Sequence, residues 1–193
     1  MAYHGVKFKT SILGEAYPIP ENIEELASWC NCFAENGLAP THPGGTYGNL
    51  SIRVKDGILI SATSLDLSKK LHASDFVYVN SCNYELFEMT VFGNRPPSSE
   101  TPIHWSLYKL RPEINAVFHG HHDDLLRLAS TLNIPETESE QAYGSIALVH
   151  EIIKVANYDF FNMKNHGFIS VGKTMKEAGE LALMQLDKLR INL

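Results

Sequence analysis

Two histidines two residues apart close an apolar, strand-like segment, 116–121 (AVFHGH). Because side chains alternate between the two faces of a strand, His119 and His121 point the same way and form a pair of potential metal ligands. His166, directly before another apolar run, offers a third nitrogen, and Glu100, where a loop turns into a helix, offers a carboxylate. Three histidines with an acid or a water form the ligand set of a catalytic divalent metal ion, most often zinc. The spacing alone is also compatible with polar residues at a sheet edge.

Three short polar stretches have the residue types that bind phosphate. Glycines allow a ligand to approach the backbone closely, and hydroxyls with free N–H groups at a helix start donate hydrogen bonds to anions. Each stretch alone is also compatible with a plain turn. Together with the histidines they predict a site that holds a phosphate at one end and polarises oxygens at the other. The stretches are 44–49 (GGTYGN), 61–64 (SATS) and 98–99 (SS).

Composition narrows the class of protein. The chain has 193 residues, of which 44% are hydrophobic and 20% charged, so we expect one globular domain over residues 1–193. The net charge of -6 argues against a nucleic-acid or anionic-membrane partner. No apolar run reaches the roughly 20 residues that span a bilayer, and segment 1–7 lacks the apolar core of a signal peptide, so we expect a cytoplasmic protein. Cys30, Cys32 and Cys82 are odd in number and are expected to be reduced thiols.

Periodicity predicts α/β layers around a largely antiparallel sheet. Lys55-Asp56-Gly57 is a hairpin signal between two apolar runs, and Ser99 is the expected N-cap of a helix whose first turn contains Glu100. Gly37 is the expected stop of the opening helix. The expected helices are 21–36, 100–110, 123–132, 146–156 and 174–189. The expected strands are 47–54, 57–61, 75–80, 84–89, 114–119, 159–163 and 168–171.

Five motifs occur in an order that resembles the class II aldolase/adducin family, which includes fuculose-phosphate aldolase and ribulose-phosphate 4-epimerase. They are 48–53 (GNLSIR), 60–63 (ISAT), 97–104 (PSSETPIH), 116–121 (AVFHGH) and 165–167 (NHG). The resemblance covers about residues 20 to 190. It implies a three-layer α/β/α sandwich with a central, mainly antiparallel sheet, assembled as a homotetramer with active sites at subunit interfaces.

The resemblance also implies roles for residues. His119, His121 and His166 would bind zinc, and Glu100 would ligate the empty metal and act as the proton-transfer base. Gly48, Asn49, Thr63, Ser64, Ser98 and Ser99 occupy the phosphate-binding positions. His104, one helical turn after Glu100, is either a supporting residue of the site or a packing residue. The family's aldolases have Ser-Ser-Glu where its 4-epimerases have Ser-Ser-Asp, so Glu100 favours an aldolase.

Two departures from the family pattern concern the substrate. Aldolases of the family usually have Thr-Gly where this chain has Thr63-Ser64, so a side chain stands where phosphate would approach the backbone. The chain also ends at Leu193, without the tyrosine that fuculose-phosphate aldolase supplies near its C-terminus. The proton donor to the leaving group is therefore unassigned, with Tyr143 as a candidate beside its simpler role as a turn residue.

Two other interpretations compete. Segment 167–174 (GFISVGKT) matches the phosphate loop of nucleoside triphosphatases, but its interior is apolar and strand-like, which argues against nucleotide hydrolysis. An adducin-like interaction protein would be expected to lose metal ligands, whereas all four remain. We therefore expect a zinc-dependent aldolase-type lyase that cleaves a small sugar phosphate through a metal-stabilised enediolate. A 4-epimerase, decarboxylase or dehydratase of the same family is the alternative.

Overall fold

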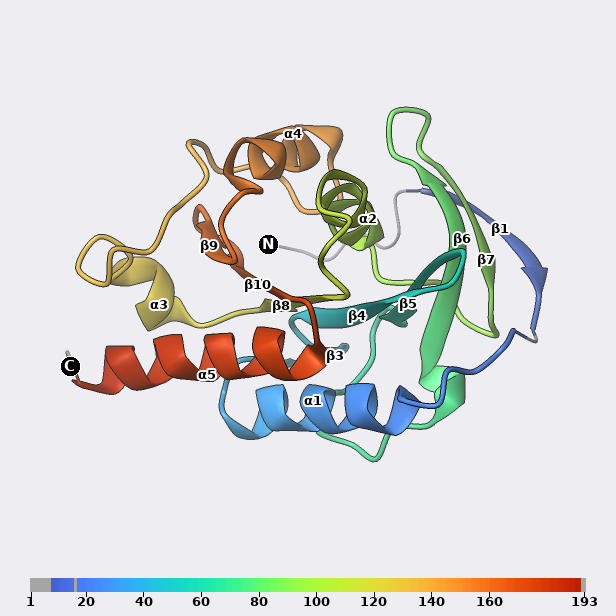
Figure 1. The fold of residues 1–193 in the computed structure, drawn as a ribbon, viewed down its shortest axis with the longest axis horizontal. Helices are drawn as coiled ribbons and strands as arrows, with labels where there is room; N and C mark the ends of the chain where they lie inside the picture. Colours follow the sequence, from blue (N-terminus) through green and yellow to red (C-terminus); the bar gives the residue numbers. More distant parts are fainter. Residues whose placement is uncertain (1–7, 16, 192–193) are drawn as a thin grey trace.

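The structure is a computed structural model that describes residues 8–15 and 17–191 (Figure 1). The expectation that concerns segment 1–7 therefore lies outside the described residues. The described chain folds around one sheet of eight strands in the order β1-β7-β6-β5-β4-β8-β10-β9. The strands are β1 (Lys9–Gly14), β4 (Asn49–Val54), β5 (Gly57–Ser61), β6 (Phe76–Asn83), β7 (Glu88–Phe92), β8 (Ala116–Gly120), β9 (Phe160–Met163) and β10 (Gly167–Gly172). The pairing of β1 with β7 is parallel and the other pairings are antiparallel.

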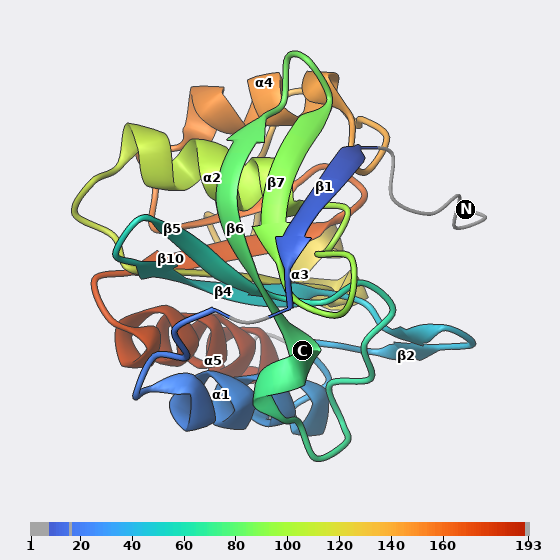
Figure 2. The ribbon, with the colours of Figure 1, turned by 90° about the vertical axis from the view of Figure 1, so that its right-hand side faces the viewer.

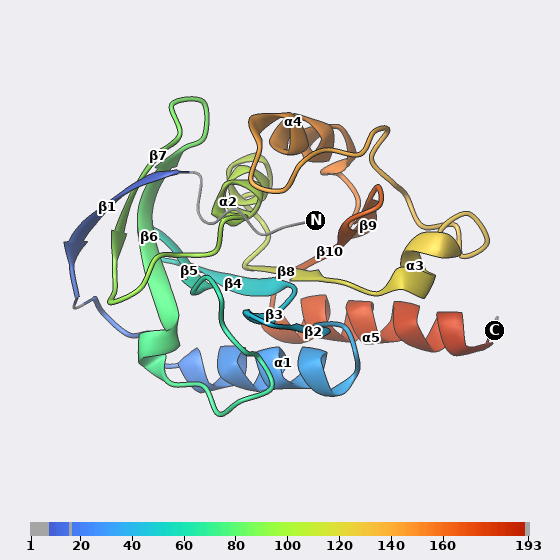
Figure 3. The same cartoon turned by 180° about the vertical axis from the view of Figure 1, so that it is seen from behind.

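Helices cover both faces of the sheet, which confirms the predicted three-layer α/β/α sandwich. Helices α1 (Ile23–Glu35) and α5 (Met175–Ile191) lie on one face. Helices α2 (Thr101–Leu110) and α4 (Ile146–Val155) lie on the other, as the view from behind also makes clear (Figure 3). The remaining elements are short: β2 (Thr41–His42) and β3 (Gly45–Thr46) form a separate hairpin that projects from the body (Figure 2), and a 3-10 turn (Ala73–Asp75) and α3 (Asp123–Arg127) lie in connections.

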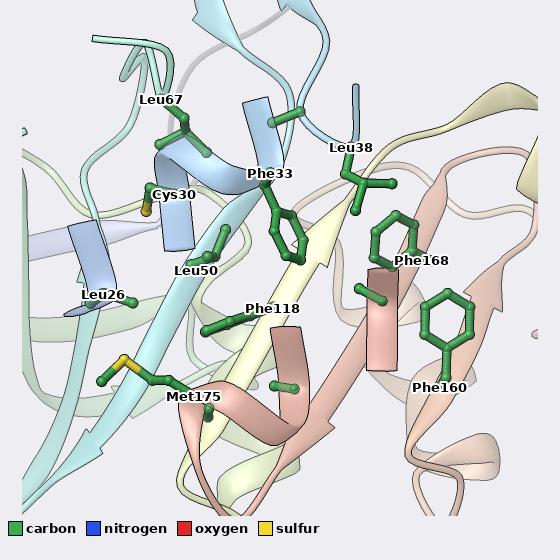
Figure 4. Close-up of a cluster of buried hydrophobic side chains, with 14 of the residues drawn as sticks. Leu26, Cys30, Phe33, Leu38, Leu50, Leu67, Phe118, Phe160, Phe168 and Met175 are labelled. Carbon is green, nitrogen blue, oxygen red and sulfur yellow. The ribbon is translucent and has the colours of Figure 1, made fainter. Parts of the chain in front are cut away.

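Two apolar cores hold these layers together, one on each face of the sheet. Alternation along β8 divides its side chains between them: Phe118 faces α1 and α5, and Val117 faces α2 and α4. On the first face the ring of Phe33 meets Phe118 edge-on at 5.5 Å and lies 6.1 Å from Phe168 (Figure 4). Each of these fully buried rings contributes about 1.5–3 kcal/mol through removal from water.

The antiparallel topology brings the predicted site residues to one end of the sheet. The start of β4 lies beside the end of β8, where Asn49 is paired with His119. The end of β8 lies beside the start of β10, where Gly120 is paired with Phe168. The N–H of Leu50 donates to the Ser61 hydroxyl, which places the end of β5 at the same edge. Segments distant in the sequence therefore meet at this edge because neighbouring strands run in opposite directions.

One predicted strand is displaced. The sequence predicts a strand over 84–89, but β7 occupies Glu88–Phe92 and the preceding residues form a turn. The side chain of Asn83 accepts a hydrogen bond from the N–H of Leu86, and Phe87 adopts a positive φ of 53°. An asparagine side chain that replaces a backbone acceptor ends strand pairing, although the following residues have apolar, strand-like character.

Two helix boundaries differ from the prediction. Helix α3 ends at Arg127 rather than at residue 132, because the following residues form irregular turns that end at Asn133 with φ 54°. Ser99 is not the N-cap of α2: Glu100 occupies that position, and its side chain makes no capping hydrogen bond. The helix start is tied instead by Thr101, whose N–H and hydroxyl both donate to the Ser98 carbonyl. The carboxylate of Glu100 is thereby left for other partners.

Strands β1, β2 and β3 are not predicted from the sequence, and the other elements differ from prediction by a few residues at their ends. The segment that matches a phosphate loop has a structural role, because its residues 167–172 form β10, a buried strand. Helix α5 then begins with its own cap, since the N–H of Glu177 donates to the Thr174 hydroxyl and the Glu177 carboxylate accepts from the N–H of Lys173. Two of the N–H groups that a phosphate could use there are therefore already hydrogen-bonded.

Candidate active site

Three imidazoles converge at the edge where β8 ends and β10 begins. His119, which is fully buried, is part of β8, and His166 lies in the turn between β9 and β10. His121 follows the strand end rather than lying within the strand, and its N–H is held by the carbonyl of Leu38 at 2.8 Å. The Nε2 atoms of His119 and His121 are 3.0 Å apart, and ligand nitrogens of all three residues lie within 4.8 Å of one another.

Backbone contacts orient this cluster. The Nδ1 of His119 lies 2.8 Å from the carbonyl oxygen of Phe168, and a carbonyl can only accept, so Nδ1 carries a proton and Nε2 faces the cluster. The adjacent glycine is required by space: a Cβ on Gly167 would lie 2.5 Å from the Gly120 carbonyl oxygen and 2.7 Å from His119 Cε1. The strand pairing itself therefore fixes the direction of the imidazole.

Glu100 reaches two of the three histidines. Its Oε2 lies 3.1 Å from His119 Nε2, and its Oε1 lies 3.0 Å from His166 Nε2. The amide of Asn49 donates to Oε2 at 2.8 Å, and the whole Glu100 residue is only 6% exposed. Burial would raise the pKa of this carboxyl, but the neighbouring charges and hydrogen bonds of His119 and His166 outweigh burial and hold the pKa well below its ordinary value.

The donor set fits a divalent metal ion. Burial and the neighbouring His119 and His166 charges hold the pKa of His121 well below its ordinary value, which favours the neutral, ligating form. For His119, burial is outweighed by the carboxylate of Glu100, which raises the pKa. The 3.1 Å contact between His119 Nε2 and Glu100 Oε2 is stabilised by positive charge between the two atoms, which either a proton or a metal ion would supply. His119, His121 and His166 are the residues that would hold the metal ion.

Most residues predicted to bind phosphate border this cluster. Residues 62–64 run beside 96–98, linked by the N–H of Thr63 to the Pro96 carbonyl and by the N–H of Ser98 to the Ser61 carbonyl. The Ser98 hydroxyl accepts a hydrogen bond from the N–H of Glu100 at 3.3 Å. Ser99, the residue between them in the sequence, is buried. These contacts bring Ser98 and Ser99 next to the candidate acid.

Gly48 and Ser64 have unusual backbone conformations. Gly48 has φ +88°, and a Cβ there would lie 2.7 Å from the carbonyl oxygen of His119. Ser64 has φ 53°, the left-handed region that glycine adopts most easily. The Arg95 guanidinium, which sequence reasoning missed, donates to the carbonyls of Thr63 and Ser64 and pairs with Asp75 at 3.1 Å. Its charge therefore adjoins the segment predicted to hold phosphate.

An aromatic stack at the edge of the cluster was also missed. The Tyr47 ring lies 5.0 Å from the His121 ring and 4.6 Å from the His42 ring, and Tyr47 is 45% exposed. Its position directly before Gly48 was the available signal. Tyr143, the predicted candidate proton donor, lies half-exposed in the turn before α4, with Gly144 at φ 61°. His104 is fully buried beside Ser51, one helical turn from Glu100.

Comparison with known proteins identifies a matching family and relatives that act on sugar phosphates by name. The family described as Class II Aldolase and Adducin N-terminal domain matches residues 24–192. The chain is 36% identical over 103 residues to a methylthioribulose-1-phosphate dehydratase of Yersinia enterocolitica, covering 52% of this chain and 45% of the relative. It is 43% identical over 77 residues to an L-fuculose phosphate aldolase of Haemophilus influenzae, covering 40% and 32%. The chain thus spans less than half the length of these two relatives. A 5-methylthioribulose-1-phosphate/5-deoxyribulose-1-phosphate aldolase of Rhodospirillum rubrum is 29% identical over 155 residues, covering 72% and 67%.

Solved structures have the same fold. An L-fuculose 1-phosphate aldolase aligns with a TM-score of 0.72 and 21% identity over 91% of this chain and 84% of that chain. A sugar-phosphate aldolase from Thermotoga maritima aligns with a TM-score of 0.73 and 20% identity over 89% and 93%. None of the helices in the described part of the chain has the length and apolar character that crossing a bilayer requires. With the family match over most of its length, the chain belongs to the class II aldolase and adducin family.

Proposed function

We propose that this protein is a zinc-dependent lyase that cleaves a carbon–carbon bond of a small sugar phosphate in the manner of an aldolase. One observation carries the proposal: the buried carboxylate of Glu100 lies within 3.1 Å of His119 Nε2 and 3.0 Å of His166 Nε2, inside a cluster of three potential metal-ligating imidazoles. An acid placed directly at a metal site can transfer a proton to and from a carbon that the metal has made acidic.

Different residues of the site have different roles in the proposed reaction. Zinc bound by His119, His121 and His166 would supply a Lewis acid that draws electrons from a substrate carbonyl. In synthesis Glu100 takes the proton from the carbon next to that carbonyl, and in cleavage it donates a proton to the same carbon. In cleavage the hydroxyl that becomes the aldehyde gives its proton to a second group, for which Tyr143 is the candidate. Asn49 holds the carboxylate by its 2.8 Å hydrogen bond. Burial of the carboxylate keeps bulk water away from the transferred proton.

Phosphate recognition is assigned to the segments beside the cluster. Gly48, Asn49, Thr63, Ser64, Ser98 and Ser99 are the proposed phosphate-binding residues. The charge of Arg95, which is held against Thr63 and Ser64, favours an anion there. The left-handed conformation of Ser64 leaves its backbone in the shape that a glycine would have.

A dehydratase is the second candidate. The 36% identity to a methylthioribulose-1-phosphate dehydratase favours it. The first step is shared, because Glu100 again removes a proton next to a carbonyl. In dehydration the electron pair then expels a hydroxide from the neighbouring carbon, whereas in aldol cleavage a carbon–carbon bond breaks. The two reactions therefore differ in the leaving group and not in the proposed base.

The test is deuterium exchange into dihydroxyacetone phosphate in D2O, followed by NMR with zinc-loaded protein. We expect exchange of one hydroxymethyl proton with the native chain, none with Glu100→Gln, and native exchange with Glu85→Gln, which changes a surface glutamate paired with His150. No exchange by native protein with zinc bound would contradict the aldolase assignment. Methylthioribulose 1-phosphate then separates the candidates: an aldolase yields a three-carbon phosphate, and a dehydratase yields a product that keeps all carbons.

Three further properties belong to this proposal. They are a single domain over residues 1–193, a homotetramer, and a cytoplasmic location with small molecules rather than nucleic acid or membrane as partners. The family resemblance and the net charge of -6 support them. Light scattering of the purified protein tests the assembly: a mass of four chains is expected, and a monomeric mass would contradict it.

A further inference from the structure

Polar side chains on strand β4 pair with helix α2 inside an otherwise apolar interface. Alternate residues of β4 point toward α2, and their partners on α2 are spaced by one helical turn. Two residues of a strand advance about 6.6 Å and four residues of a helix about 6.0 Å, so successive pairs stay aligned. The pairs are Asn49 with Glu100, Ser51 with His104 and Tyr108, and Arg53 with the carbonyls of Tyr108 and Arg111.

The middle pair has three short contacts. The Ser51 hydroxyl lies 2.7 Å from Nδ1 of His104 and 3.0 Å from the Tyr108 hydroxyl. The Tyr108 hydroxyl also donates to the main-chain carbonyl of Ser51 at 3.0 Å. All three residues are buried, with Ser51 and His104 at 0% exposure.

These contacts determine where each proton lies. A carbonyl only accepts, so Tyr108 uses its one hydroxyl proton on the carbonyl of Ser51. The single Ser51 proton is then directed to the Tyr108 hydroxyl or to the Val117 carbonyl, which lies 3.4 Å from the Ser51 hydroxyl. With that proton used, the proton in the contact between Ser51 and His104 comes from Nδ1 of His104. Burial, with the nearby charge of His119, lowers the pKa of His104 to about 3, so the ring is neutral. A neutral ring that is protonated on Nδ1 has a bare lone pair on Nε2.

A second bare acceptor lies on the neighbouring pair. The carboxylate of Glu100 only accepts, so the Asn49 amide must turn its nitrogen toward Glu100 and its Oδ1 away. Within the described chain, Asn49 Oδ1 and His104 Nε2 are both buried without a hydrogen-bond partner. A buried acceptor left unpaired costs about 1–3 kcal/mol, so two of them on adjacent pairs beside an acid indicate a site for a donor.

We propose that His104 Nε2 and Asn49 Oδ1 form a preformed acceptor site that binds an O–H donor beside Glu100. The two acceptors lie on neighbouring strand–helix pairs beside Glu100, and each is buried without a partner in the described chain. Ser51 and Tyr108 act as positioning residues that fix the tautomer of His104. A water molecule has two protons and donates to both acceptors, whereas a hydroxyl of the substrate has one proton and donates to His104 Nε2. The substrate arm alone rests on the proposed function.

The tautomer is tested by long-range ¹H–¹⁵N NMR of ¹⁵N-histidine-labelled protein at neutral pH, without substrate. His104 is assigned by its loss in His104→Gln or, if that variant does not fold, by the proximity of its ring protons to Tyr108. We expect the shift of a protonated nitrogen for Nδ1 and of an unprotonated nitrogen for Nε2. A protonated Nε2 would overturn the proposal. This readout does not depend on activity, so it stands or fails separately from the proposed function.

Crystal structures of the zinc-loaded protein with and without dihydroxyacetone phosphate identify the donor. A water within about 3.2 Å of His104 Nε2 in both structures supports the water source. A substrate hydroxyl at that position in the second structure supports the substrate source, and His104→Phe should then raise KM about 2–10-fold, the value of one neutral hydrogen bond. An empty position in both structures would overturn the proposed site.

Discussion

The side-chain amide of Asn49 donates a 2.8 Å hydrogen bond to the carboxylate of Glu100. Asn49 is also paired with His119 across β4 and β8. One strand residue thereby connects the candidate acid with the candidate metal ligand, and a change at this residue acts on both. Outer residues of this kind usually affect metal affinity or activity about 10–100-fold when replaced.

Replacement of Asn49 by alanine should lower zinc affinity or turnover by about 10–100-fold, because Glu100 loses its neutral donor. Zinc affinity is measured by competition with a chelator, and thermal unfolding reports the fold. Asn115→Ala is the control, since Asn115 is exposed and donates to the Lys173 carbonyl at the opposite end of the sheet. Native zinc affinity together with native turnover in Asn49→Ala would refute a role for Asn49 at the site.

Replacement of His119 by alanine should abolish bound zinc and turnover together, because the cluster loses its central imidazole. Zinc content after dialysis is measured by atomic absorption, and circular dichroism verifies folding. His150→Ala is the matched control, because His150 is an exposed histidine that pairs with Glu85. Turnover that persists in the His119 variant would sink the ligand assignment.

Alanine substitutions at two glycines with similar positive φ angles distinguish the cost of backbone strain from the cost of a steric clash. Gly37 has φ +75°, and a Cβ added to it would find open space, with no contact within 4 Å among the described residues. A Cβ on Gly48, by contrast, would lie 2.7 Å from the His119 carbonyl oxygen. Gly37→Ala should therefore cost about 1–2 kcal/mol of unfolding free energy through strain alone. Gly48→Ala should cost about 2–4 kcal/mol and also weaken zinc binding. Denaturant unfolding measures both, and equal losses would show that the contact with His119 is not important.

Ser64 adopts a left-handed conformation with φ 53°. Ser64→Gly should raise the unfolding free energy by about 0.5–1 kcal/mol, because the gain from relieved strain exceeds the greater chain entropy of glycine in the unfolded state. Ser64→Ala is the control, since it removes the hydroxyl but keeps the Cβ and the strain. Stabilisation by both substitutions would trace the effect to the hydroxyl instead.

Much of the fold was predictable because its signals are local. Periodicity located α1, α2, α4 and α5, and a three-residue turn signal located the hairpin of β4 and β5. The parallel pairing of β1 with β7 was not predictable, because it depends on contacts between segments about 80 residues apart. The early end of α3 depends on turns that end at Asn133, whose left-handed conformation has no apolar signature.

The residue types of the candidate site were predictable from the sequence, whereas the contacts between side chains of different elements were not. The spacing of His119 and His121 predicts a pair of potential ligands on one face, and folding brings His166 and Glu100 to them. The contact of Ser51 with His104 could not be predicted from either segment, because it requires the alignment of a strand with a helix. The same holds for Tyr47, whose ring reaches His121 through a turn.

The position of His166 in the turn between β9 and β10 has a consequence for metal binding during synthesis of the chain. A chain made from its N-terminus contains Asn49, Glu100 and His119 well before His166 leaves the ribosome. The turn is held within the β9–β10 hairpin, where the N–H of His166 donates to the Met163 carbonyl. The hairpin reaches His119 through the pairing of β10 with β8, so the ligand set is completed late. Binding of the ion by all three histidines would thus require that β10 has paired with the sheet. A nascent chain would not bind zinc with the full ligand set before then.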